Sequence, residues 1–247
     1  MHGEGGSVGR RTAVAILTLA IAALALILFR EISGLVRRPD AKPTGRLVDH
    51  GAWLAYLPEG WQPEERRPLV FALSPTGDAR WAISAWVSVA DRHRWLVAAS
   101  KEFRNGQEFG PSLKRIEAEL DAVERTYAVD AGRVVVTGLS GGGMGSHAFS
   151  KFFPDRVSAV VINTGMMHAP FMTGDYPEGK RAVFLASPTD FRYTEMKRDR
   201  RFLEEHHWAT LWIEFPGGHT MAPASVYEQA AAWLEGHLPS VSGQGPR

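Results

Sequence analysis

Residues 133–142 read RVVVTGLSGG, and this stretch decides the fold of the chain. The β-branched run 133–137 is typical of a buried strand, whereas the residues that follow Ser140 favour a helix. Between them stands the pattern Gly-x-Ser-x-Gly, in which Gly138 and Gly142 lie two residues before and after the serine. A strand, a sharp turn at the serine and a helix are the context in which this pattern forms a nucleophile elbow.

The glycines follow from the backbone geometry of such a turn. The serine sits at a strained backbone position, and side chains two residues away on either side would collide, so both places need glycine. The serine hydroxyl then stands clear of the sheet edge, and the amide of Gly141 can face a developing oxyanion at the positive end of the helix. A glycine-rich turn without chemistry is the alternative, but it would not require a strand before it and a helix after it. We therefore predict Ser140 as a nucleophile and Gly141 as an oxyanion donor.

Outside the elbow, short apolar runs alternate with amphipathic stretches. This alternation predicts an α/β fold with a mostly parallel central sheet and helices on both faces. In open sheets of this kind ligands bind beyond the carboxyl ends of the strands, so chemistry is expected at that edge. The expected strands are 52–57, 69–73, 95–99, 133–137, 159–163, 182–186 and 210–215, and the expected helices are 79–90, 111–127, 141–152, 194–207 and 223–238.

The composition fits one domain and excludes several chemistries. A chain of 247 residues that is 45% hydrophobic can bury one sizeable core but is short for two full domains. The 28 basic and 27 acidic residues nearly cancel, so the net charge of +1 gives no reason to expect a nucleic acid partner. Because the chain has no cysteine, disulfides, thiolate zinc sites and cysteine nucleophiles are excluded.

Residues 12–29 form an uncharged apolar run that follows Arg10 and Arg11 and precedes Arg30. As a helix this run would be about 27 Å long, just enough to span a bilayer, and it lacks the polar stripe of a buried core helix. A cleaved signal peptide is the alternative. Its best small-residue site, 23–25, lies inside the apolar run, which favours an uncleaved membrane anchor.

The apolar run predicts a membrane-anchored or exported protein, and basic residues on both sides of it leave the orientation open. The arginine pair before the run slightly favours the extracytoplasmic side. The residues after it mix charges with proline and glycine, as a linker does. The expected organisation is a tail (1–11), a transmembrane anchor or signal segment (12–29), a linker (30–46), the domain that carries the elbow (47–238) and a flexible tail (239–247).

At the elbow the chain resembles the α/β-hydrolase family. Residues 127–140, YAVDAGRVVVTGLS, look most like the polyhydroxybutyrate depolymerase and feruloyl esterase branch. The resemblance covers roughly residues 50–238. The resemblance is specific at the elbow and around His219, and it is weak in the rest of the chain. It implies a catalytic domain. Fewer than twenty residues separate the strands expected at 159–163 and 182–186, which is too few for a helical lid domain.

A serine hydroxyl needs an imidazole base, and the imidazole needs a carboxylate to hold it. The resemblance implies that these three residues follow in the chain order serine, acid, histidine. His219 follows the last expected strand and fits the position of the base. Asp190 follows the strand before it and fits the acid. Relatives usually carry a histidine-glycine pair before this aspartate, and here Ser-Pro-Thr stands there instead. A turn cap is the alternative role for such an aspartate.

Other acidic residues and histidines are held in reserve or given structural roles. The reserve acids are Asp175, Glu195 and Asp199. His206 and His207 are adjacent on an expected helix and point about 100° apart, so they are a poor metal pair. The histidines expected to be surface or packing residues are His50, His93, His147, His168, His206, His207 and His237.

The second oxyanion donor is expected after the strand 69–73. Relatives commonly have a histidine-glycine pair there, whereas this chain reads Ser-Pro-Thr-Gly-Asp at 74–78. Pro75 has no amide hydrogen, so the backbone amide of Thr76 is the expected donor.

The segment between the strands 159–163 and 182–186 offers candidates for a substrate pocket. Its Met166, Met167 and Phe171 are expected to line an acyl or aryl site, since methionine and aromatic side chains suit adaptable apolar pockets. Packing of the same side chains on the core is the alternative.

These residues together predict a serine hydrolase that cleaves carboxylic esters, small or polymeric, through an acyl-enzyme, with no cofactor and no metal. Peptidase, amidase and thioesterase activities use the same constellation and stay open as alternatives. A further alternative is a non-catalytic, membrane-tethered binding domain, which the altered oxyanion loop makes worth considering. The oligomeric state is left open.

Overall fold

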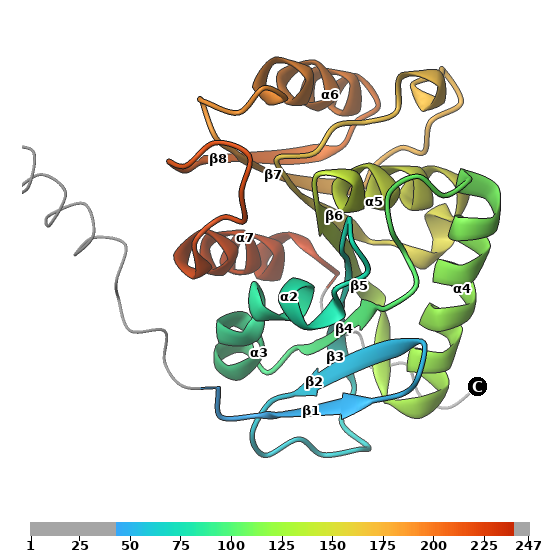
Figure 1. Cartoon of the computed structure of the whole chain (residues 1–247), viewed down its shortest axis with the longest axis vertical. Helices are drawn as coiled ribbons and strands as arrows, with labels where there is room; N and C mark the ends of the chain where they lie inside the picture. Colours follow the sequence, from blue (N-terminus) through green and yellow to red (C-terminus); the bar gives the residue numbers. More distant parts are fainter. Residues whose placement is uncertain (1–42, 240–247) are drawn as a thin grey trace, which may run out of the picture. The chain divides into compact units, whose positions relative to one another are not determined.

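The computed structural model describes residues 43–239, and they form an α/β structure around one sheet (Figure 1). The strands are β1 (Arg46–Asp49), β2 (Trp53–Leu57), β3 (Arg67–Leu73), β4 (Leu96–Ser100), β5 (Val129–Leu139), β6 (Ala159–Asn163), β7 (Arg181–Ala186) and β8 (Ala209–Glu214). The helices are α2 (Ala79–Ser84), α3 (Val87–His93), α4 (Phe109–Thr126), α5 (Gly141–Phe152), α6 (Tyr193–Glu205) and α7 (Ala224–His237), with short 3₁₀ turns η1 (Pro154–Arg156) and η2 (Ala169–Phe171).

The strand order in the sheet is β1-β2-β4-β3-β5-β6-β7-β8. β2 runs antiparallel to β1 and β4, and every pairing from β4 to β8 is parallel. The chain first adds β4 on one side of β3 and then crosses to add β5 on the other side. The carboxyl end of β5 therefore lies near the point where the order of the sheet changes direction, which is where open α/β sheets form their ligand crevices.

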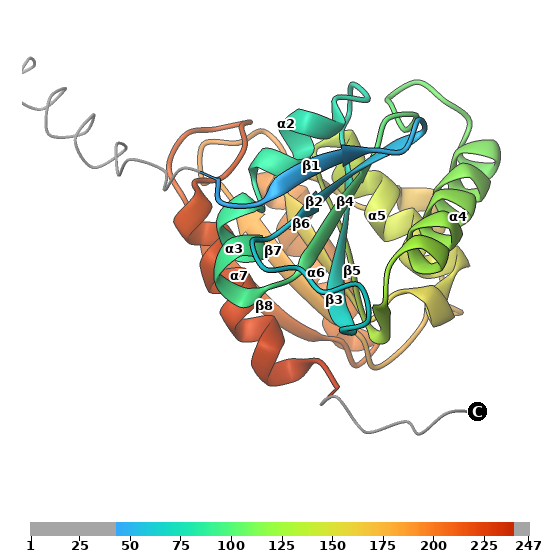
Figure 2. The same ribbon diagram turned by 90° about the horizontal axis from the view of Figure 1, so that it is seen from below.

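Both faces of the sheet are covered, so the central residues of its inner strands are apolar and buried. On β3, Leu69, Phe71 and Leu73 belong to one core cluster, and Val70 and Ala72 belong to a second cluster on the opposite face. Residues of α4, α5 and α6 complete the first cluster, and residues of α2, α3 and α7 complete the second. Figure 2 shows α4 and α5 on one side of the sheet and α3 and α7 on the other.

The predicted fold class, a mostly parallel sheet with helices on both faces, is confirmed. All of the expected strands are present, but β1 was not predicted, because it is a short edge strand with a mostly exposed sequence. The helix expected at 79–90 is two helices, since Trp86 turns the chain and buries its ring against Tyr227.

The N-terminal predictions lie outside the described part of the chain. The anchor or signal segment 12–29 and the tail beyond residue 239 are not among residues 43–239, so both stay predictions. Within residues 43–239, no helix has the length and apolar character needed to cross a bilayer.

One core residue, His147 on α5, gives the fold a pH dependence. Its side chain is buried, and neither ring nitrogen has a hydrogen-bond partner among the described residues. Burial disfavours the charged imidazolium and lowers the pKa of His147 from 6.5 to about 3. Below pH 6.5 the unfolded chain therefore binds a proton that the folded protein does not bind until about pH 3.

We expect this histidine to lower the free energy of unfolding as the pH falls, by about 1.4 kcal/mol per unit between the two pKa values. Replacing it in the variant His147→Leu should remove this contribution, so the stability of the variant should fall less between pH 7 and pH 5. Urea unfolding of both proteins across that range measures the difference. Equal pH dependence in the two proteins would show that the ring is not the titrating group.

Candidate active site

Ser140 occupies a strained turn between β5 and α5. Its backbone has φ +54° and ψ −116°, on the positive-φ side that side chains disfavour and that costs about 1–3 kcal/mol. Two hydrogen bonds hold the turn: the Ser140 amide donates to the Asn163 carbonyl at 3.0 Å, and the Ser140 carbonyl accepts from the Met144 amide at 3.1 Å. This is the backbone conformation that the sequence pattern predicts for the elbow.

The two flanking glycines are required by contacts that leave no room for a side chain. A Cβ atom on Gly138 would lie 2.4 Å from the carbonyl carbon of Gly142. A Cβ atom on Gly142 would lie 2.0 Å from the carbonyl oxygen of Leu73, on β3. Helix α5 thus packs directly against the backbone of two strands, and this close approach fixes the turn at Ser140.

His219 and Asp190 form a hydrogen-bonded pair at the same edge of the sheet. His219 lies in the loop after β8, and its Nδ1 is 2.6 Å from Oδ2 of Asp190, which lies in the loop after β7. The Asp190 carboxylate is completely buried, and its Oδ1 accepts the backbone amide of Arg192 at 2.6 Å. Because a carboxylate can only accept, Nδ1 carries the hydrogen, which leaves Nε2 as the basic nitrogen.

The reserve acids have other partners. Asp175 is exposed and bonds to Thr173 and Lys151, which lower its pKa to about 2. The buried carboxylate of Asp199 accepts the Met167 amide and pairs with Arg198, and burial raises its pKa. Glu195 pairs with Arg192 at 3.6 Å. Of the four candidate acids, Asp190 is the one that contacts His219.

The hydrogen bond that the mechanism expects between Ser140 and His219 is not formed in this structure. Among the described residues, no hydrogen bond joins the Ser140 hydroxyl to His219, although both lie at the carboxyl edge of the sheet. Such bonds are often long or poorly aligned in proteins without bound substrate and tighten when substrate binds. The catalytic roles of Ser140, His219 and Asp190 therefore stay predictions.

Asn163, at the end of β6, links the serine turn to the histidine loop. Its carbonyl accepts the Ser140 amide, and its side-chain Nδ2 donates to the Thr220 carbonyl at 2.9 Å. Its Oδ1 accepts from the Ala222 amide at 2.7 Å and from the Tyr227 hydroxyl at 2.8 Å. The sequence analysis missed this residue. A polar residue that ends an otherwise apolar strand at the catalytic edge is the signal that could have found it.

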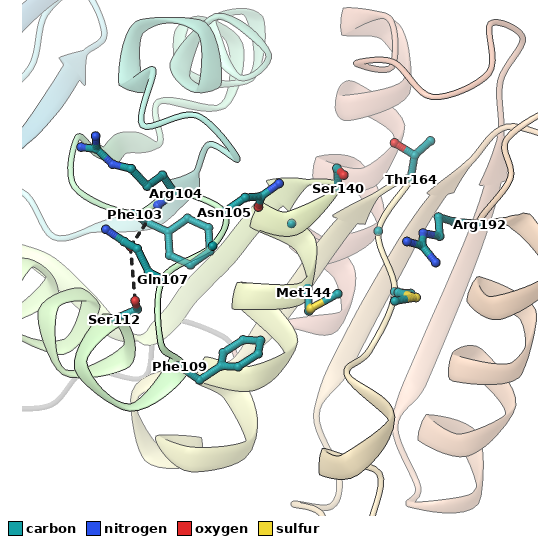
Figure 3. A pocket seen from close by; sticks show the side chains of 14 residues that line it. Phe103, Arg104, Asn105, Gln107, Phe109, Ser112, Ser140, Met144, Thr164 and Arg192 are labelled. Carbon is teal, nitrogen blue, oxygen red and sulfur yellow. Dashed lines mark hydrogen bonds between the residues drawn. The ribbon is translucent and has the colours of Figure 1, made fainter.

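Ser140 and Gly141 open into a cavity of about 270 Å³ (Figure 3). Most of one wall comes from the loop between β4 and α4, which the sequence analysis did not consider. The other lining residues are Phe103, Arg104, Asn105, Gly106, Gln107, Phe109, Ser112, Met144, Thr164, Gly165, Met166 and Arg192.

The structure corrects two of the three residues predicted to line a substrate pocket. Met166 lines the cavity, but Met167 is only 1% exposed and belongs to the core, so it has no surface to offer a substrate. Phe171 packs against the rings of Phe109 and Phe152 and is not part of the cavity wall. Met167 and Phe171 pack in or against the core, which was the alternative interpretation of these side chains.

The structure also corrects the expected oxyanion donor Thr76. Its amide donates to the Ser74 hydroxyl at 3.2 Å, and the residue is not part of the cavity wall. Gly141, in contrast, lines the cavity at the first turn of α5.

Within residues 43–239, no three histidine or carboxylate side chains come together as a metal site would need.

No protein-family model and no curated protein matches the sequence. The fold is similar to that of a thermostable esterase, with 16% identity and a TM-score of 0.61 over 79% of this chain and 62% of that protein. It is also similar to a ferulic acid esterase, with 14% identity and a TM-score of 0.59 over 77% and 96% of the two chains. An S-formylglutathione hydrolase from Staphylococcus aureus matches with 13% identity and a TM-score of 0.62 over 77% and 98%.

At identities of 13 to 16%, these likenesses speak for the fold and not for the activity. Together with the strand order and the antiparallel second strand, they show that the chain has the α/β-hydrolase fold. The predicted fold is thereby confirmed.

The side-chain hydrogen bonds of Asn163 give a prediction about stability. The variant Asn163→Ala would leave the buried Ala222 amide without its acceptor, so it should lower the free energy of unfolding by about 3 kcal/mol. Tyr227→Phe removes one of the same bonds and should cost only about 1 kcal/mol. Chemical denaturation of the parent and both variants measures these values. A loss in Asn163→Ala no larger than that in Tyr227→Phe would mean that the amide does not hold the histidine loop.

Proposed function

We propose that this protein is a serine hydrolase that cleaves carboxylic esters through an acyl-enzyme. The observation that carries the proposal is the strained backbone of Ser140 at the mouth of a cavity, on the sheet edge that also bears the His219 and Asp190 pair. Backbone strain of this kind is expected where a reactive side chain must be held in one position. The chain shares its fold with two esterases and a hydrolase, which makes ester hydrolysis the first reaction to test.

In the first half of the reaction, Ser140 Oγ attacks the ester carbonyl carbon and its proton passes to Nε2 of His219. Asp190 keeps the histidine in the required tautomer and stabilises the imidazolium. The carbonyl oxygen becomes an oxyanion that the Gly141 amide can bind at the start of α5. Collapse of this intermediate breaks the bond to the alcohol, which leaves with the proton from His219.

In the second half, a water molecule gives its proton to His219 and attacks the acyl-enzyme, and the acid is released when Ser140 recovers that proton. Because no hydrogen bond joins Ser140 to His219 among the described residues, the mechanism requires that this bond form when substrate binds. Amide and thioester substrates would follow the same steps. Because S-formylglutathione is a thioester, the similarity to its hydrolase makes a thioester the second substrate type to test.

We expect Ser140→Ala to lower kcat for p-nitrophenyl acetate by about 10⁴- to 10⁶-fold, because the remaining site retains only binding and oxyanion contacts. A fluorophosphonate probe should label the parent at Ser140 and leave the variant unlabelled. Circular dichroism and thermal unfolding check that the variant is folded. Turnover by Ser140→Ala within tenfold of the parent would exclude the mechanism, and an unlabelled parent without turnover would favour a non-catalytic binding domain.

The acid is tested by Asp190→Asn, which keeps the size of the side chain but favours the wrong tautomer of His219. Its kcat should fall by about 10³- to 10⁴-fold. The control Asp175→Asn alters an exposed carboxylate that bonds Thr173 and Lys151, so its kcat should stay within about tenfold of the parent. Steady-state kinetics with the same ester compare the two. If Asp190→Asn keeps the kcat of the parent, the assignment of Asp190 as the acid is overturned.

A further inference from the structure

The proposed reaction needs a second group to bind the oxyanion beside the Gly141 amide, and residues 75–77 of the loop after β3 have no free backbone donor for it. Pro75 has no amide hydrogen. The Thr76 amide donates to the Ser74 hydroxyl at 3.2 Å, and the Gly77 amide donates to the Ser74 carbonyl at 3.3 Å. The backbone donors of residues 75–77 are therefore engaged within the loop itself.

Asn105, an exposed residue in the loop between β4 and α4, places its side-chain amide beside Gly141. Its carboxamide lies against Gly141, since a Cβ atom on that glycine would be 1.7 Å from Oδ1 and 3.0 Å from Nδ2 of Asn105. Among the described residues, no hydrogen bond engages this carboxamide. Figure 3 shows the side chain of Asn105 reaching toward Ser140, with its nitrogen at the leading end.

The loop that carries Asn105 is held in place from several sides. The Asn105 amide donates to the Pro75 carbonyl at 2.9 Å, so the loop after β3 fixes its backbone. Gln107 accepts the Arg104 amide and donates to the Glu102 carbonyl, which closes the loop upon itself. Phe103, just before these residues, is buried in the core. A donor on such a support needs little reorganisation when charge develops, which is what makes oxyanion binding effective.

We propose that the side-chain amide of Asn105 is the second oxyanion donor of this enzyme. The inference rests on the proposed function, because it assigns a role in the same reaction. The Nδ2–H group and the Gly141 amide bind the oxygen that becomes negative when Ser140 attacks, and Asn105 takes no part in proton transfer. The loop after β3 has a supporting role, since Pro75 holds the backbone of Asn105.

The test is a kinetic comparison of Asn105→Ala, Asn105→Asp and the parent with p-nitrophenyl acetate. Loss of one oxyanion donor should lower kcat by about 10²- to 10³-fold with little change in KM. The aspartate variant keeps the size of the side chain but carries a negative charge, so its loss should be at least as large. Glu102→Ala, which changes an exposed side chain of the same loop outside the cavity wall, is the control and should stay within about threefold.

A second readout separates oxyanion binding from a merely structural role. A trifluoromethyl ketone forms a hemiketal anion with Ser140. Its affinity for Asn105→Ala should fall by about the same factor as kcat, while the melting temperature changes little. If both Asn105 variants keep kcat and ketone affinity within about threefold of the parent, the proposal is overturned and the esterase assignment stands. Absence of turnover that depends on Ser140 in the parent would instead overturn the proposed function, and this inference with it.

Discussion

The strained backbone of Ser140 is the constraint on which the rest of the site depends. A positive φ is uncommon for a residue with a side chain, and it persists only when the neighbouring structure leaves no alternative. β5 lies between β3 and β6 inside the sheet, and α5 approaches so closely that Gly138 meets Gly142. Side chains at these glycines would push the helix away and let the serine relax into an ordinary turn.

Polar contacts hold His219, the predicted base, and the backbone on both sides of it. Gly217 and Gly218 precede His219 and both have positive φ, so the chain itself does not fix the histidine. The Gly218 amide bonds to the Ser187 hydroxyl, and Asn163 holds the backbone on the other side of the histidine. The Asn163 carbonyl also accepts the Ser140 amide. One buried residue at the end of β6 therefore holds both the turn at Ser140 and the loop that carries His219.

The loops after β3 and β4 both lie beside the proposed oxyanion site. The loop after β3 uses its own amides for internal hydrogen bonds and gives its Pro75 carbonyl to the neighbouring loop. The loop after β4 forms much of the cavity wall and brings Asn105 to Gly141. Because β3 and β4 are parallel, their carboxyl ends lie at the same edge of the sheet. The loop after β4 can therefore supply the proposed oxyanion donor that the loop after β3 was expected to supply.

The sequence by itself determined the elbow, the α/β alternation and the positions of the candidate triad residues. These features depend on a short window of chain: an apolar run, two glycines around Ser140, or a polar residue after a strand. Only the tertiary structure decided that Asp190 contacts His219, that Met167 lies in the core, and that the Thr76 amide is engaged. It alone also revealed Asn163 and Asn105, since loops that are far apart in the chain meet only after the sheet has set its strand order.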